Sequence, residues 1–229
     1  MNKQAIITIL LALVAVAGQA QEIKKVAATP EDFMEHMALC GYEVFTYDIS
    51  SLKDDTYSLS FVIREYVNGE LVSDSESNGR PATFMNRRMM EDIPEASRDK
   101  VTKEFAYDYE KGIVSLSEKI TIGFSPAADS LKQMLVSLES MGSTSRGLAL
   151  KPLDDQNNKN RYAYDIRPFK LEALQLGEFT PLLLVGSFWY DERYGIFRFC
   201  GEREMPADMS SPSIPMIPHY YVVGVKVRK

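Results

Sequence analysis

The stretch YSLSFVIREYVNGELV, residues 57–72, decides the class of fold. Apolar side chains recur at every second position from Tyr57 to Ile63, which is the period of a β-strand with one buried face. Asn68-Gly69 then separates this run from Glu70-Leu71-Val72. Asn-Gly between two such runs is the strongest short signal of a two-residue hairpin turn. The stretch therefore predicts two antiparallel strands.

Further short extended runs follow along the chain, with turn residues between them. In the last, Tyr221, Val223, Val225 and Val227 are predicted to face the core. The run 131–141 also fits a helical stripe, and we favour a strand because Gly142 leads directly into another extended run. Many short strands with little helix predict a mainly β fold, an antiparallel β-sandwich or a pair of small ones. The predicted runs are 43–50, 57–67, 70–72, 112–124, 131–141, 148–153, 161–170, 180–190, 194–202 and 220–228.

One short N-terminal helix is also predicted. Thr29-Pro30-Glu31-Asp32 combines a hydroxyl cap, a proline at the first helical position and acids in the first turn. Gly41 is placed to end the helix in a left-handed conformation. A second short helix is predicted over residues 94–103.

Residues 154–160 form a polar loop, which is the best boundary between an N-terminal β-rich half, residues 21–153, and a C-terminal half, residues 154–229. Phe45-Thr46-Tyr47-Asp48-Ile49 recurs as Tyr162-Ala163-Tyr164-Asp165-Ile166. The recurrence leaves two alternatives open: two similar immunoglobulin-like halves, or two halves that pack as one domain.

Residues 1–20 have the three parts of a secretion signal: a positive charge at Lys3, an apolar run from Ala5 to Ala17, and small residues at the end. The apolar run is shorter than the roughly 20 residues that span a bilayer. We therefore expect cleavage before Gln21, no transmembrane anchor afterwards, and a periplasmic or extracellular protein. Gln21 is not a cysteine, so the protein is not expected to be a lipoprotein.

The whole chain carries 26 basic and 32 acidic residues. Removal of residues 1–20 takes away only Lys3, which leaves 25 basic against 32 acidic residues and a net charge of −7. Such a chain repels phosphate backbones, so no nucleic acid partner is expected. No cofactor motif and no metal-ligand spacing is present, so we expect neither a cofactor nor a metal.

Catalytic groups are sparse. The two histidines, His36 and His219, have no partner at metal-ligand spacing and are interpreted as ordinary surface or packing residues. Asp191-Glu192 and the pair Glu202 and Glu204 could supply the two carboxylates of a glycoside hydrolase. Acids at turns are usually solvated, so the sequence favours a protein that is not an enzyme.

Two surfaces are candidates for binding. Trp189, Tyr190, Asp191 and Tyr194 surround a predicted hairpin tip, where aromatic rings could stack on sugars or pack in the core. The proline-rich segment 205–218 carries Ile214, Met216 and Ile217, which are either a partner-binding strip or a cover over a sheet edge.

Cys40 and Cys200 form either one disulfide or two buried free thiols, and their spacing does not decide between these alternatives.

Several segments resemble an uncharacterised family of secreted, signal-peptide-bearing proteins from gut Bacteroidetes. They are Gly41–Phe45, the Tyr57–Gly69 hairpin, Gly186–Glu192, Phe197–Glu202 and His219–Val222. The resemblance implies an exported domain of unknown function and brings no catalytic residues. The favoured hypothesis is a non-enzymatic, exported β-sandwich protein that binds a glycan or a protein partner at the cell envelope. The alternative is an envelope hydrolase that acts on glycans through paired carboxylates.

Overall fold

The computed structural model describes residues 25–52, 57–77, 80–81, 92–105, 107–108, 113–114, 119–138, 142–153 and 161–228. The predicted signal, residues 1–20, lies outside these residues. The chain divides into two units, Met1–Leu39 and Cys40–Lys229.

The described part of the first unit contains one helix, α2 (Pro30–Leu39). Its start is fixed by a reciprocal cap: the Asp32 N–H donates to Thr29 Oγ1 at 3.2 Å, and the Thr29 N–H donates to Asp32 Oδ2 at 2.8 Å. Gly41, just after the helix, has a φ of 81°, which favours glycine. The predicted N-terminal helix is therefore confirmed.

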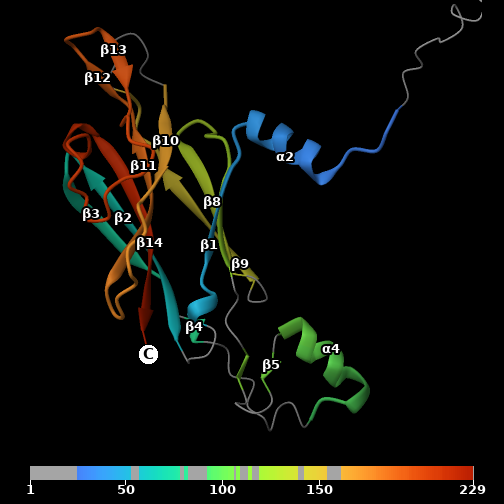
Figure 1. Cartoon of the computed structure of the whole chain (residues 1–229). Coiled ribbons are helices and arrows are strands. Elements are labelled where there is room, and N and C mark those ends of the chain that lie inside the picture. Colours follow the sequence, from blue (N-terminus) through green and yellow to red (C-terminus); the bar gives the residue numbers. More distant parts are fainter. Residues whose placement is uncertain are drawn as a thin grey trace, which may run out of the picture. The chain divides into compact units, whose positions relative to one another are not determined.

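The described part of the second unit contains two large antiparallel sheets and two short strand pairs (Figure 1). The four-stranded sheet has the order β1-β7-β8-β9: β1 (Glu43–Asp48), β7 (Lys119–Phe124), β8 (Leu131–Leu138) and β9 (Gly142–Ala149). The six-stranded sheet has the order β10-β11-β14-β2-β3: β10 (Tyr164–Pro168), β11 (Phe179–Ser187), β14 (His219–Arg228), β2 (Ser58–Val67) and β3 (Glu70–Glu76), with β4 (Arg80–Pro81) also paired to β2. The mainly β, antiparallel prediction is confirmed, as is the strand in residues 131–141.

The smaller elements of this unit are helix α4 (Glu95–Phe105), the pairs β5 (Tyr107–Asp108) with β6 (Ile113–Val114) and β12 (Trp189–Asp191) with β13 (Ile196–Arg198), and the 3₁₀ turns Ser50–Leu52 and Ile214–Met216. None of the helices in the described ranges has the length and apolarity that a membrane crossing requires.

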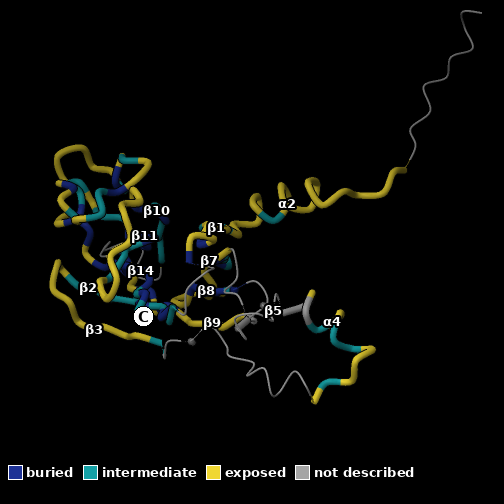
Figure 2. The backbone as a smooth tube through the Cα atoms, turned by 60° about the horizontal axis from the view of Figure 1, so that its bottom comes forward, coloured by how far each residue is buried: buried dark blue, intermediate teal, exposed yellow. Residues whose placement is uncertain are grey.

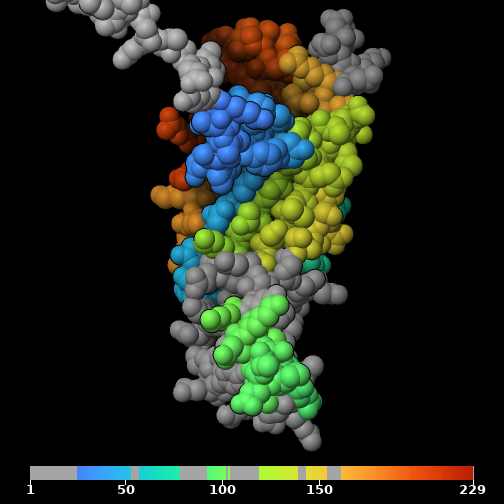
Figure 3. All heavy atoms as spheres, turned by 90° about the vertical axis from the view of Figure 1, so that its right-hand side faces the viewer, coloured from blue at the N-terminus to red at the C-terminus, as the bar shows by residue number. Residues whose placement is uncertain are grey.

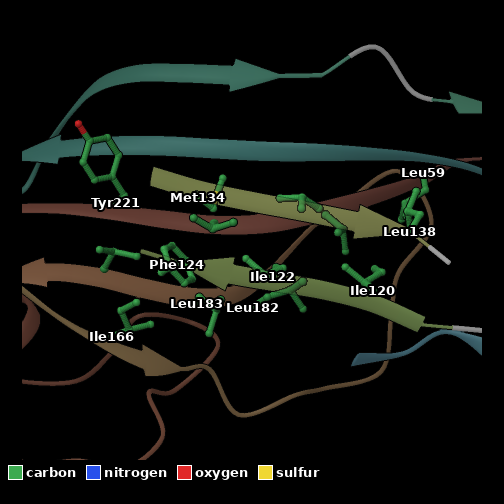
Figure 4. Packing of buried hydrophobic residues seen from close by; sticks show 14 of the residues in the cluster. Leu59, Ile120, Ile122, Phe124, Met134, Leu138, Ile166, Leu182, Leu183 and Tyr221 are labelled. Carbon is green, nitrogen blue, oxygen red and sulfur yellow. The ribbon is translucent and has the colours of Figure 1, made fainter. Parts of the chain in front are cut away.

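The main core lies between the two sheets, and both sheets contribute side chains to it (Figure 4). β7 and β8 supply every second residue, among them Ile122, Phe124 and Met134, whereas Leu135 on the opposite face of β8 is 47% exposed. Figure 3 shows β8 and β9 side by side, in yellow-green to yellow. The alternation of buried and less buried residues along β7 and β8 therefore places one face of this sheet against the other sheet.

A second core lies on the other face of the six-stranded sheet. Leu184, Tyr220 and Val222 point into it, while their strand neighbours Val185 and Tyr221 point into the main core. Strands β11 and β14 are therefore buried on both faces, and Figure 2 shows β14 in dark blue, whereas β3, on the far side of β2, is exposed. This explains why their sequences are continuous apolar runs. The residues of the second core are Phe169, Leu184, Cys200, Met205, Ile214, Ile217, Tyr220 and Val222.

One detail differs from the expectations. The predicted hairpin of 180–190 with 194–202 is wrong in most of its length, because β11 pairs with β10 and β14 and only β12 pairs with β13. The break falls at Phe188, whose N–H donates to the Ala163 carbonyl at 3.0 Å. The halves 21–153 and 154–229 share the six-stranded sheet, since β2 and β3 come from the first half and β10, β11 and β14 from the second.

Candidate functional site

The β12–β13 hairpin places the aromatic residues that the sequence singles out. Tyr190 lies opposite Phe197 in the strand register, and their ring centroids are 5.2 Å apart. At the tip, the Asp191 carbonyl accepts the Gly195 N–H at 2.8 Å, and Asp191 Oδ1 accepts the Arg193 N–H at 3.1 Å. Gly195 has a φ of 64°, which a glycine adopts without strain. The tip is thus closed by its own backbone and by Asp191.

An ion pair orders the side chains on this hairpin. Arg198 Nε lies 2.9 Å from Asp191 Oδ2, and the Arg198 guanidinium lies 4.5 Å from the centroid of the Tyr194 ring. The Arg193 guanidinium lies 5.4 Å from the same ring. A cation within about 6 Å of a ring centroid is attracted to it. Tyr194 is therefore held against two guanidinium groups, and it is still 57% exposed.

The four aromatic residues near the tip separate into two pairs. Tyr190 and Tyr194 are 51% and 57% exposed. Trp189 packs against the second core, and Phe188 lies with its ring centroid 5.4 Å from that of Phe199. Packing within the fold therefore accounts for Trp189 and Phe188, and of these four residues only the two tyrosines present an exposed ring.

The proline-rich segment covers the outer face of the six-stranded sheet. Ile214 and Ile217 are buried in the second core, and of the three apolar residues proposed as a partner strip only Met216 is exposed. Two of the three side chains are therefore used within the fold, and the segment covers a face of the sheet where the sequence suggested an edge.

Both cysteines are free thiols in the structure. Cys40 is exposed, whereas Cys200 lies in the second core, and burial raises the pKa of the Cys200 thiol to about 11. A thiol that stays protonated at neutral pH is a poor nucleophile.

The carboxylates proposed for a hydrolase have structural partners. Asp191 is paired with Arg198, and Glu202 Oε1 accepts the hydroxyl of Ser211 at 2.6 Å. Hydrogen bonds, first among them that from Ser211, hold the pKa of Glu202 below its usual value. A general acid needs a raised pKa. The hydrogen bonds of Glu202 lower its pKa, which is the opposite of what that role requires. The other two acids, Glu192 and Glu204, are exposed.

A separate surface cavity of about 260 Å³ is lined by the segment after β10 and by Ala207 and Asp208. The lining segment runs from Lys170 to Pro181 and so includes the start of β11. Among the described residues, no group of three His, Cys, Asp or Glu side chains is arranged to hold a metal ion.

A buried polar network was missed by the sequence analysis. His219, interpreted there as ordinary, is 1% exposed, and both of its ring nitrogens have partners: Nε2 lies 3.0 Å from Glu65 Oε1, and Nδ1 contacts the Tyr164 hydroxyl. The Tyr164 hydroxyl also accepts the Lys151 N–H at 2.9 Å, and the His219 N–H donates to Ser187 Oγ at 3.2 Å. Four strands of the six-stranded sheet thus meet in one hydrogen-bonded group.

The fold and the hairpin define the class: a mainly β protein of two packed antiparallel sheets with exposed tyrosines on a short surface hairpin. Within this class, the chain belongs to the family described as a domain of unknown function (DUF5041), whose family model matches residues 12–229. No curated protein and no solved structure matches the chain.

Proposed function

We propose that this protein is an exported, non-catalytic binding protein of the cell envelope, and that its β12–β13 hairpin binds a glycan. The observation that carries the proposal is the exposure of Tyr190 and Tyr194 on a hairpin whose side chains are already ordered by the Asp191–Arg198 ion pair. Rigid aromatic rings provide a large contact area at a low cost in conformational entropy. The two arginines and Asp191 add groups that can donate to and accept from sugar hydroxyls.

Replacement of both tyrosines tests the site. A glycan array identifies the ligand of the chain from Gln21 onward, and titration calorimetry then compares it with a Tyr190→Ala, Tyr194→Ala double variant. Affinity is expected to fall at least about tenfold, which corresponds to about 1.4 kcal/mol. Trp189→Ala would be a poor probe, because Trp189 also packs against the second core.

Two variants serve as controls for this experiment. Tyr42→Ala removes a tyrosine that is 40% exposed elsewhere on the chain, and it should leave binding unchanged. Lys170→Ala alters the separate cavity, so loss of binding in this variant alone would assign the ligand to the cavity. If no glycan on the array binds, the choice of ligand class is wrong.

Export is tested separately from binding. The full-length chain, expressed with an intact secretion pathway, should be recovered outside the cytoplasm with Gln21 as its first residue by mass spectrometry. Deletion of residues 2–20 should retain the protein in the cytoplasm, because the apolar targeting segment is then missing. An uncleaved chain in the membrane fraction would contradict the proposal and indicate an N-terminal anchor.

A further inference from the structure

The network around His219 connects the two sheets. The Lys151 N–H donates to Tyr164 of β10 at 2.9 Å, and the Ala149 carbonyl accepts the Tyr221 hydroxyl of β14 at 2.8 Å. The segment Ala149–Lys151 leaves the last strand of the four-stranded sheet, while both tyrosines belong to the six-stranded sheet. The two tyrosine hydroxyls therefore hydrogen-bond this segment, which follows the four-stranded sheet, to the six-stranded sheet.

The hydrogen-bond partners of His219 indicate a neutral ring protonated on Nε2. The Tyr164 oxygen already accepts the Lys151 N–H, so its own proton is available for His219 Nδ1. Nδ1 is then an acceptor, and the ring proton resides on Nε2, where it is donated to the Glu65 carboxylate. Each polar atom of the chain Glu65–His219–Tyr164–Lys151 has a partner only when the imidazole is neutral.

A second proton on the ring disrupts this arrangement. Nδ1–H would then donate toward the Tyr164 oxygen, where the Lys151 N–H already donates, and the Tyr164 proton would lose its acceptor. A buried donor without a partner is costly, so Tyr164 would have to turn away. The turn would break the contact with Lys151.

We propose that His219 is a pH-sensitive latch whose protonation releases the Ala149–Lys151 segment from the six-stranded sheet. The inference does not depend on the proposed glycan function. The charged and titratable groups that face the ring are Glu65 of β2, Tyr164 of β10, Tyr221 of β14 and Lys151 after β9.

Burial and the neighbouring charges have opposing effects on the pKa of the His219 ring. Burial is the largest and lowers the pKa of His219 below its usual 6.5, the Glu65 carboxylate raises it, and the charge of Lys151 lowers it again. Burial raises the pKa of both Tyr164 and Tyr221, so these hydroxyls stay neutral across the relevant range. Because the pKa of His219 is depressed in the latched state, the opened state binds more protons around pH 6. The latch is therefore closed above about pH 6.5 and weakens as the pH falls below it.

The Lys151 amide reports directly on the latch. Native-state hydrogen exchange, corrected for the intrinsic pH dependence, should show about tenfold lower protection of this amide at pH 5 than at pH 7.5. The amide of Phe169, which donates to the Leu182 carbonyl elsewhere in the same sheet, should keep its protection. Nitrogen NMR shifts at pH 7.5 should show His219 protonated on Nε2 and unprotonated on Nδ1.

Variants separate a latch from a merely structural contact. Glu65→Gln keeps an acceptor for Nε2–H and removes the charge that raises the pKa of His219, so the loss of Lys151 protection between pH 7.5 and pH 5 should become larger. Tyr164→Phe should leave Lys151 unprotected at every pH. His36→Gln, at the other histidine, should change nothing. A ring protonated on Nδ1, or Lys151 protection that does not depend on pH in the unmodified protein, would overturn the proposal even if no variant folds.

Discussion

Gly224→Ala is expected to destabilise the protein severely. Gly224 lies on β14, opposite Pro181 of β11 and Val62 of β2. A Cβ at this position would lie 2.3 Å from the Thr180 carbonyl oxygen and 2.6 Å from the Phe179 ring. Neither can move freely, because Thr180 is backbone of a paired strand and Phe179 packs against the second core. The loss of unfolding free energy should be about 3 kcal/mol or more, measured by urea denaturation.

A matched glycine provides the control. A Cβ on Gly201 would meet nothing within 4 Å, so Gly201→Ala should change the unfolding free energy by no more than about 0.5 kcal/mol. For a chain of this size, about 3 kcal/mol corresponds to a decrease of roughly 6–12 °C in Tm. Equal Tm values for the two variants would show that β11 and β14 can separate locally without cost, contrary to the close approach seen at Gly224.

Local periodicity predicted which segments form strands, but not which parts of the chain pack against them. The alternation in β2 is short-range information, since this strand buries one face, and it gave the correct type of element. The run that forms β8 fits a helix as well as a strand, and Gly142 with the extended run after it decided correctly for a strand. The run 220–228 was predicted to face the core with Tyr221, Val223, Val225 and Val227 alone, whereas β11 and β14 are both buried on two faces. Their second buried face depends on the segment after residue 199, which has no period of its own and folds over the sheet through long-range contacts.

The polar network could not be found for the same reason. Glu65 and His219 are 154 positions apart in the chain, and each is an ordinary residue in its own strand. They meet only because β14 inserts between β11 and β2 in the sheet order. Strand order and register are set by the packing of the whole core, so a local pattern around His219 holds no signal for its partners. The hairpin tyrosines, by contrast, were found from a local cluster of aromatic residues, and burial then separated the exposed rings from the packed ones.

Ile217→Asp is the second substitution with a large expected effect. Ile217 is 0% exposed in the second core, next to Gly186 of β11. A carboxylate there has to be buried without a partner or expel the covering segment from the sheet. The unfolding free energy should fall by about 3–5 kcal/mol, and limited proteolysis should cut between residues 203 and 217.

Met216→Asp is the natural control, because Met216 is the adjacent residue and is 58% exposed. It should change stability by no more than about 0.5 kcal/mol. The pair also tests the connection between the second core and the hairpin. Since Trp189 packs against that core, Ile217→Asp should weaken ligand binding through a loosened hairpin, while Met216→Asp should not. Loss of binding in Met216→Asp at unchanged stability would instead identify the proline-rich segment as the surface that meets the partner.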